Sequence, residues 1–224
     1  MASRKRRWWP LAALSFFAIL CGWVMLDLAV PVRGSLREFD SHAVARMETA
    51  MWRSYYGHHS VRLFRELAEL LRTQYHLPFW RSQAGAYRAA KAAVVFQRGH
   101  NRGEYERALP DLEAFYRLIR AASGAPFDAG KAARLELDWW IVHRERAARD
   151  PGDLERALAT LQAEIYGDPA ARFEDHARAR AEAMLLRDAR AGAGAVSEAD
   201  WTRIGELLDT SWTSLRVAVA HRGQ

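Results

Sequence analysis

Several residue types and motifs that mark well-known functional classes are missing from this chain of 224 residues. It contains a single cysteine, Cys21, so it forms no internal disulfide and has no paired cysteines for zinc or covalent haem attachment. It also lacks a phosphate-binding glycine loop, a dinucleotide fingerprint, a nucleophile elbow and a His-Glu-x-x-His zinc motif. We therefore expect no cofactor, and the missing motifs favour a protein that is not an enzyme without excluding one.

A concentrated basic surface is also missing. The formal net charge is +6, but four of the 33 basic residues are Arg4, Lys5, Arg6 and Arg7 at the start of the chain. The remaining 29 basic residues are interspersed among 27 acidic ones, without a basic stripe. Binding to phosphate backbones requires clustered positive charge, so we exclude nucleic acid as a partner.

The longest stretch without a charge runs from residue 8 to residue 26. As a helix it would be about 28 Å long, which is enough to cross the hydrocarbon core of a bilayer. Trp8, Trp9 and Trp23 suit the two membrane interfaces, and the four basic residues of the tail over residues 1–7 mark the cytoplasmic side. The pattern predicts a single-pass anchor of a bacterial-type inner membrane, with a cytoplasmic N-terminal tail and a translocated remainder.

A cleaved signal peptide has the same order of basic, apolar and polar regions and is the alternative to an anchor. The segment that follows the apolar stretch, residues 27–34, reads DLAVPVRG and contains no A-x-A cleavage pattern. We therefore expect an uncleaved anchor, a short linker over residues 27–34 and an exported domain over residues 35–224.

No part of the exported domain alternates with period two, so we expect no strands and an all-α fold of about seven to eight helices. One helix is predicted from a Ser35 cap to Gly57, and another from Pro78 to about Gln97. Pro110 should kink or restart a helix. Asp150-Pro151 and Asp168-Pro169 each read as an N-cap followed by the first helical residue.

One short segment occurs twice: GEYERAL at residues 103–109 and GDLERAL at residues 152–158. Its glycine and alanine spacing resembles the second helix of tetratricopeptide-type hairpins, over about residues 86–167. The resemblance implies hairpins packed side by side, close helix contacts at Ala108 and Ala157, and a protein-interaction surface. The 49-residue spacing departs from the 34-residue repeat, so an irregular bundle stays open as the alternative.

The segment LELDWWIVHRER, residues 135–146, places polar groups on both sides of one predicted helix. Glu136 and His143 share a side because seven residues make nearly two turns, and Asp138 and Glu145 share the opposite side. The neighbouring apolar residues put Glu136 and His143 inside the fold. They lie about 10.5 Å apart along the axis, so each needs another partner.

Two more glutamates, Glu48 and Glu182, fall on predicted apolar faces, and an unpaired buried carboxylate is costly. Either arginines pair with these carboxylates, with Arg53, Arg144, Arg180 and Arg187 as candidates, or the carboxylates line a binding pocket. The candidate ligand-binding residues are Glu48, Trp52, Tyr55, Glu136, Trp140, His143 and Glu182.

A metal site is not assigned from the sequence. Carboxylate-bridged metal bundles use Glu-x-x-His pairs, and the chain contains none. His58 and His59 follow Gly57 in a predicted turn, where such a pair is normally solvated.

Two functions of different classes fit these observations. The first is a membrane-anchored scaffold or accessory subunit that binds another protein of the cell envelope. The second is a helical bundle that binds a ligand or metal, or acts as an enzyme, through a buried Glu/His pocket.

Overall fold

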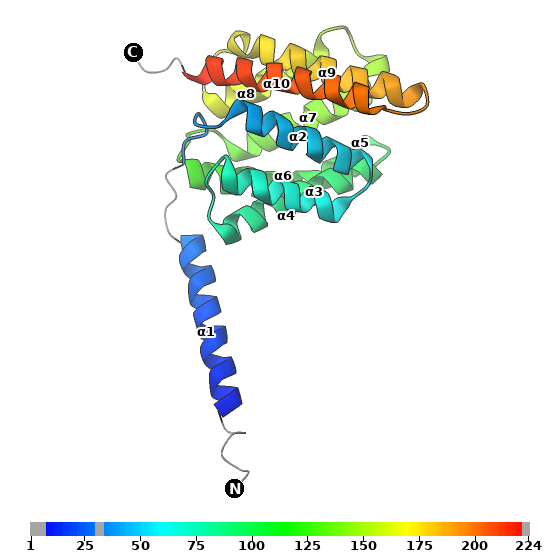
Figure 1. Ribbon diagram of the computed structural model, residues 1–224. Helices are drawn as coiled ribbons and strands as arrows, with labels where there is room; N and C mark the ends of the chain where they lie inside the picture. Colours follow the sequence, from blue (N-terminus) through cyan, green and yellow to red (C-terminus); the bar gives the residue numbers. More distant parts are fainter. Residues whose placement is uncertain (1–7, 30–33, 221–224) are drawn as a thin grey trace.

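The structure is a computed structural model that describes residues 8–29 and 34–220, and every regular element in these ranges is a helix (Figure 1). This confirms the predicted all-α class. Helix α1 (Trp8–Ala29) projects from a body in which α3 (Ser60–Thr73), α4 (Phe79–Arg98) and α6 (Leu109–Ser123) lie on the side nearest α1. On the far side are α8 (Asp153–Tyr166), α9 (Glu174–Gly192) and α10 (Glu198–Ala220), with α2 (Ser41–Tyr56) and α7 (Ala129–Arg144) between the two sides. The short elements are α5 (Arg102–Tyr105) and the 3-10 turns η2 (Glu106–Ala108), η3 (Arg146–Ala148) and η4 (Ala170–Phe173).

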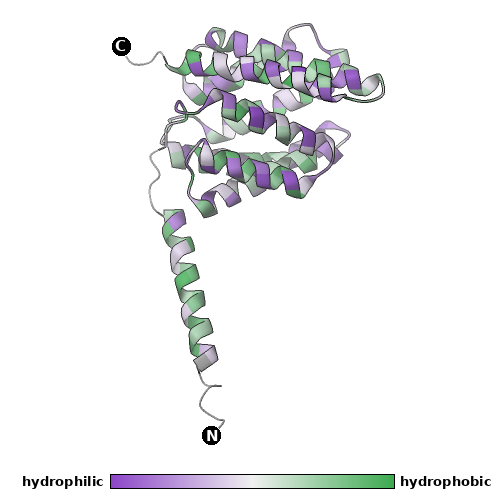
Figure 2. Ribbon diagram, viewed as in Figure 1, coloured by the Kyte–Doolittle hydropathy of each residue, from purple (hydrophilic) through white to green (hydrophobic). Residues whose placement is uncertain are grey.

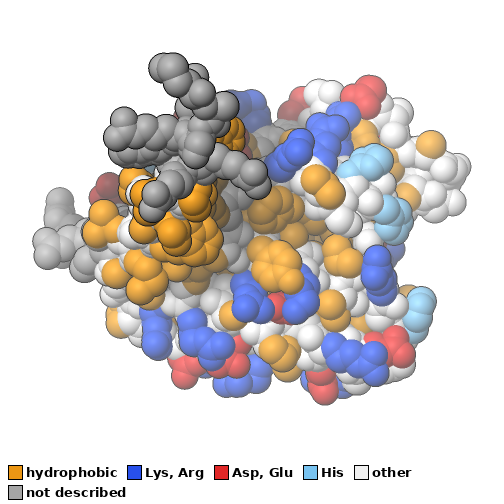
Figure 3. All heavy atoms as spheres, turned by 90° about the horizontal axis from the view of Figure 1, so that it is seen from below, with side chains coloured by type: hydrophobic (Ala, Val, Ile, Leu, Met, Phe, Trp, Pro, Cys, Tyr) orange, Lys and Arg blue, Asp and Glu red, His pale blue; other side chains and the backbone are white. Residues whose placement is uncertain are grey.

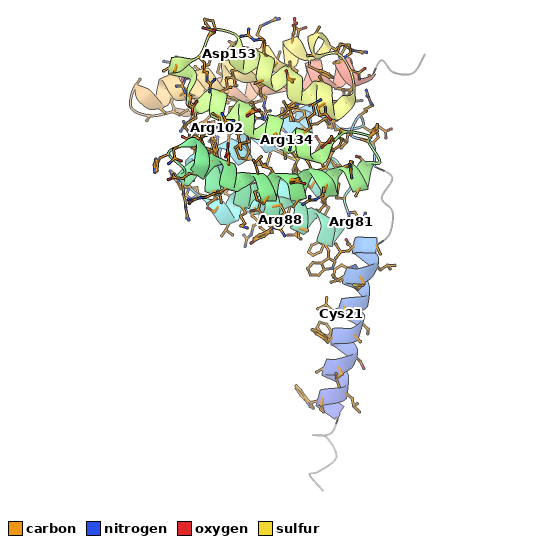
Figure 4. All side chains as sticks on the ribbon, turned by 180° about the vertical axis from the view of Figure 1, so that it is seen from behind. Cys21, Arg81, Arg88, Arg102, Arg134 and Asp153 are labelled. Atoms are coloured by element: carbon orange, nitrogen blue, oxygen red, sulfur yellow. The ribbon has the colours of Figure 1, made fainter. Side chains whose placement is uncertain are left out.

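Helix α1 is long and apolar enough over Trp9–Ala29 to cross a membrane. It is the most uniformly hydrophobic element of Figure 2, and Cys21 lies about halfway along it (Figure 4). Its large apolar side chains are exposed rather than packed in the body; Ile19, for example, is 72% exposed. The predicted basic tail of residues 1–7 and residues 30–33 of the predicted linker lie outside the described residues.

The end of α1 joins the beginning of α4. Asp27 accepts hydrogen bonds from the backbone N–H groups of Trp80 and Arg81, at 3.1 and 3.3 Å, and Arg81 donates to the carbonyl of Leu28 at 2.7 Å. Figure 4 shows Arg81 where α1 meets the body. Pro78, at the N-cap of α4, has no side-chain group that could accept these N–H bonds, so Asp27 satisfies donors that α4 would otherwise leave open.

The predicted start of the first exported helix at Ser35 is wrong. Helix α2 begins at Ser41, where the side chain of Asp40 accepts a hydrogen bond from the backbone of Ala43. The preceding segment is held in a different conformation by Arg37, which donates to the backbone carbonyls of Tyr166 and Val219 at 2.7 and 2.9 Å. These long-range bonds replace the helical turn that the local sequence favours.

Helix boundaries at prolines are predicted with mixed success. Pro110 lies in the first turn of α6, which restarts the helix as expected, and α4 ends one residue beyond the predicted Gln97. Helix α8, however, begins at Asp153 instead of Pro151, because Gly152 adopts a left-handed backbone conformation and serves as its N-cap. Asp168 does not cap a long helix either: η4 intervenes before α9, and the Asp168 carboxylate pairs with Arg37 at 3.1 Å.

The two copies of the repeated segment fold differently. Residues 103–109 fall in α5, η2 and the first residue of α6, whereas residues 153–158 of the second copy open the continuous helix α8. Ala108 is fully buried, as the resemblance implies, but Ala157 is only partly buried. The structure therefore does not confirm a repeat at this segment.

Most of the apolar core falls into two large clusters. One is formed mainly by α3, α4, α6 and α7, and the other by α2, α8, α9 and α10. Trp139 of α7 packs against both clusters. The place where the two clusters meet is also where the candidate polar residues gather.

Candidate functional site: a central cavity

Glu48 of α2 is buried and forms an ion pair with Arg180 of α9. Two guanidinium nitrogens of Arg180 donate to the two carboxylate oxygens of Glu48, one of them at 2.8 Å. Trp52 and Trp212 also donate their indole N–H groups to this carboxylate, at 3.2 and 2.5 Å. Burial by itself would lower the pKa of Arg180, but the Glu48 carboxylate outweighs this effect and raises the pKa of the guanidinium group. The expectation that an arginine pairs with Glu48 is confirmed, and Arg180 is one of the candidates named for it.

The aromatic surroundings of Arg180 complete this arrangement. The rings of Trp52, Trp139 and Trp212 lie 5.8–5.9 Å from the guanidinium carbon of Arg180. The negative faces of aromatic rings attract a cation that has lost its water. Glu48 and Arg180 are therefore satisfied by the protein itself, which identifies the pair as a structural element at the inner end of the site.

Glu136 of α7 has a different environment from Glu48. It accepts hydrogen bonds from the Tyr116 hydroxyl at 2.9 Å and from the Trp140 indole at 3.0 Å. No described cation lies within ion-pair distance of this carboxylate. Burial raises the pKa of Glu136, and burial together with the nearby Glu136 charge raises the pKa of Tyr116. Glu136 is thus a partly buried carboxylate held by neutral donors, with capacity to accept a further hydrogen bond.

His143 also points into the fold, and its partner is Asp188 of α9. The Nε2 atom of His143 lies 3.1 Å from a carboxylate oxygen of Asp188, which also pairs with Arg146 at 2.7 Å and Arg187 at 2.9 Å. Burial opposes ionisation of Asp188, but these three neighbours outweigh it and lower its pKa to about 2. One carboxylate therefore connects the end of α7 to α9.

These groups line one cavity of about 560 Å³, here called the central cavity. The cavity reaches the surface at His58, Arg144 and Arg146, which are exposed, and this rim is its mouth. Six of the seven residues expected from the sequence to bind a ligand line it: Glu48, Trp52, Tyr55, Glu136, Trp140 and His143. Side chains from α2, α4, α7 and α9 thus meet around one volume, as the pocket interpretation requires.

The seventh residue, Glu182, was placed wrongly. It is exposed to solvent and does not line the central cavity. Leu185, three residues further along α9 and next to Glu182 on the helix surface, is itself 42% exposed. The inner face carries Ala177, Ala181 and Met184 instead.

The sequence does not predict that Asp188 pairs with His143, nor that arginines gather at the mouth of the cavity. A signal for them exists on α9, where Arg180, Met184 and Arg187 recur at helical spacing and all line the cavity. Two of the three residues are charged, so the stripe does not appear as an apolar side of the helix in the sequence.

A second cavity of about 200 Å³ lies beyond the inner end of the first. Glu136, Trp139 and Arg180 line both cavities and form a shared wall. Among the described residues, no group of three or more His, Cys, Asp or Glu side chains is arranged to hold a metal ion. His58 and His59 are exposed, as expected for a turn pair.

Comparison of the chain with protein families, with characterised proteins and with solved structures gives no match. Function is therefore inferred from the central cavity and from the apolar helix α1.

Proposed function

We propose that this protein is a single-pass membrane protein whose exported helical domain binds a small organic ligand in the central cavity. The observation that carries the proposal is the cavity itself. Its volume of about 560 Å³ falls within the roughly 300–1,000 Å³ typical of ligand sites. Apolar and aromatic walls with a few convergent polar groups are also typical of such sites.

The proposed topology rests on charge. Four basic residues, Arg4 to Arg7, precede the apolar helix, whereas basic and acidic residues are balanced after it. The N-terminus would then face the cytoplasm of a bacterial-type cell, and the central cavity would lie outside the inner membrane. An alkaline phosphatase fused after Gln224 is expected to be active, because that enzyme folds only after export. Activity from a cytoplasm-only reporter at the same position would reverse the topology.

The alternative function, a scaffold for another envelope protein, stays a prediction. An interaction surface is normally marked by a contiguous exposed apolar patch. Figure 3 shows the face on the side of α1, where basic and acidic side chains are interspersed with apolar ones. Outside α1, the exposed large apolar side chains of the described residues are distributed over α3, α4, α9 and α10. The cavity is the more specific feature, and ligand binding is therefore the function we propose.

The ligand-binding proposal can be tested by filling the central cavity. Ala93 of α4 lines it, so Ala93→Phe places a ring in the empty volume, while Ala84→Phe puts the same ring on the exposed face of the same helix. With full-length protein in zwitterionic nanodiscs, energy transfer from tryptophan to the uncharged probe N-phenyl-1-naphthylamine should saturate for the wild type. We expect Ala93→Phe to weaken this binding by about tenfold or more, since the ring occupies the site.

The Ala84→Phe variant is the matched control and should bind the probe like the wild type. Because every sample contains the same lipid, the difference between the two variants removes the contribution of probe dissolved in the bilayer. Equal energy transfer for the wild type and both variants would show that the central cavity is not a binding site.

A further inference from the structure

We infer that the ligand of the central cavity is an amphipathic anion, with an anionic group at the arginine-lined mouth and an apolar body in the interior. The inference rests on the proposed ligand-binding function and adds the chemical class of the ligand. Its basis is the distribution of charge and apolar surface along the cavity.

Positive charge is in excess at the mouth. Glu48 and Arg180 neutralise each other at the inner end of the cavity. Near the mouth, a single carboxylate, that of Asp188, faces three arginines: Arg144, Arg146 and Arg187. Arginine stays protonated in proteins, so this excess does not depend on pH in the physiological range.

Asp188 pairs with Arg146 and Arg187, and aromatic rings contact Arg144 and Arg187. The guanidinium carbon of Arg187 lies 3.3 Å from the ring centre of Tyr56, and that of Arg144 lies 4.5 Å from the ring centre of Phe96. Such stacking fixes a guanidinium group without using its N–H donors. The Nε atom of Arg187 is buried and has no hydrogen-bond partner among the described residues.

The ends of helices provide a competing explanation for these arginines. Arg144 is the last residue of α7, where the helix dipole favours a cation, and it donates to the carbonyl of Gly99 at 3.3 Å. Arg146 similarly donates to the carbonyl of His143 at 3.3 Å. Each of these contacts uses one donor, whereas a guanidinium group has five. Donors therefore remain for an anionic group of a ligand.

The interior suits an apolar body instead of a second charged group. The walls of the central cavity include Trp52, Trp139, Trp140, Phe96, Phe115 and Leu67. A small inorganic anion would leave this surface unoccupied. A single apolar body that carries a carboxylate, sulfonate or phosphate group matches both ends of the cavity.

The test compares two probes that share one ring system. The anionic probe is 1-anilinonaphthalene-8-sulfonate, and N-phenyl-1-naphthylamine is its counterpart without the sulfonate group. With full-length protein in zwitterionic nanodiscs, we expect the sulfonate to bind more tightly than the amine, after subtraction of the Ala93→Phe signal. Added salt should weaken the sulfonate and not the amine, because salt screens only the charged contact.

Variants of the arginines at the mouth test whether these residues cause the tighter binding of the sulfonate. The double variant Arg144→Gln/Arg146→Gln should weaken the sulfonate by about tenfold or more, since it removes charge-assisted hydrogen bonds, and should weaken the amine far less. Arg149→Gln removes an arginine that pairs with Glu145 and does not line the cavity, and it should change neither affinity. Amine binding retained by the double variant would also show that the cavity remains folded.

The outcomes separate the two proposals. If both probes bind equally, or if the double variant binds the sulfonate like the wild type, the anionic ligand is overturned while ligand binding stands. If Ala93→Phe changes neither probe, ligand binding itself fails. Phosphatidylglycerol added to the discs distinguishes two sources of the same chemistry: displacement of the sulfonate assigns the site to a membrane lipid, and unchanged binding assigns it to a soluble anion.

Discussion

Replacing Glu48 with alanine is expected to lower the free energy of unfolding by about 3–5 kcal/mol, the range for removing one partner of a buried ion pair. The variant would leave Arg180 charged among three tryptophan rings and would remove the acceptor of two indole N–H groups. Side-chain exposures of 7% for Glu48 and 14% for Arg180 leave little water to compensate. Urea unfolding of the full-length protein, followed by tryptophan fluorescence, measures the change.

Two further variants separate loss of the charge pair from loss of packing. Glu48→Leu combined with Arg180→Met should recover much of the stability, because neither charge is then left unpaired. Glu198→Ala breaks an ion pair with Arg53 in which the glutamate side chain is 82% exposed, and it should change the stability very little because solvent screens the pair. A Glu48→Ala variant as stable as Glu198→Ala would contradict the structural role of the pair.

Alanine variants of the four polar residues in and just after α7 should also differ in stability according to burial. The differences should be smaller than that between Glu48→Ala and Glu198→Ala. Glu136→Ala is expected to cost about 1–3 kcal/mol, because the Tyr116 hydroxyl and the Trp140 indole lose their acceptor. His143→Ala should cost less, about 1 kcal/mol, because Asp188 keeps two arginine partners. Asp138→Ala and Glu145→Ala remove only exposed ion pairs, worth about 0–1 kcal/mol.

The pH dependence of stability provides a control for Glu136. Because its folded pKa is raised, its contribution to stability is fully present below the unfolded pKa and is lost as pH rises through the folded pKa. Glu136→Gln carries no charge at any pH, so the variant should lack this part of the pH profile. Equal costs for all four alanine variants, or identical pH profiles for Glu136→Gln and the wild type, would mean that Glu136 is solvated.

Helical periodicity predicts the inward side of α7: Glu136 and His143 line the central cavity and Asp138 is exposed. The same reasoning fails on α9, where Leu185 is exposed and Glu182 with it. Periodicity shows which residues share a side of a helix, but the side that is buried depends on which other helices surround it. In α9 the small residues Ala177 and Ala181 form the buried side, and alanines give a weak hydrophobic signal.

Long-range polar contacts account for two other errors. The segment before α2 is irregular because Arg37 binds carbonyls at the ends of α8 and α10, 129 and 182 residues away along the chain. Asp188 acquires its role only when α9 brings it to the end of α7. The residue types at the site could be predicted from the sequence, but their pairing depends on contacts that no local pattern encodes.

The contacts between α1 and α4 connect the apolar helix directly to the helical body. Many anchored domains hang from a flexible tether and move independently of their membrane segment. Here Asp27 and Leu28 bond directly to the first turn of α4, and Trp23 stacks on Phe79 with ring centres 5.7 Å apart. The last turns of α4 carry Ala93 and Gln97 into the wall of the central cavity. Helix α4 therefore connects the end of α1 to the wall of the central cavity, so under the proposed topology and function a change in the tilt of α1 would displace that wall.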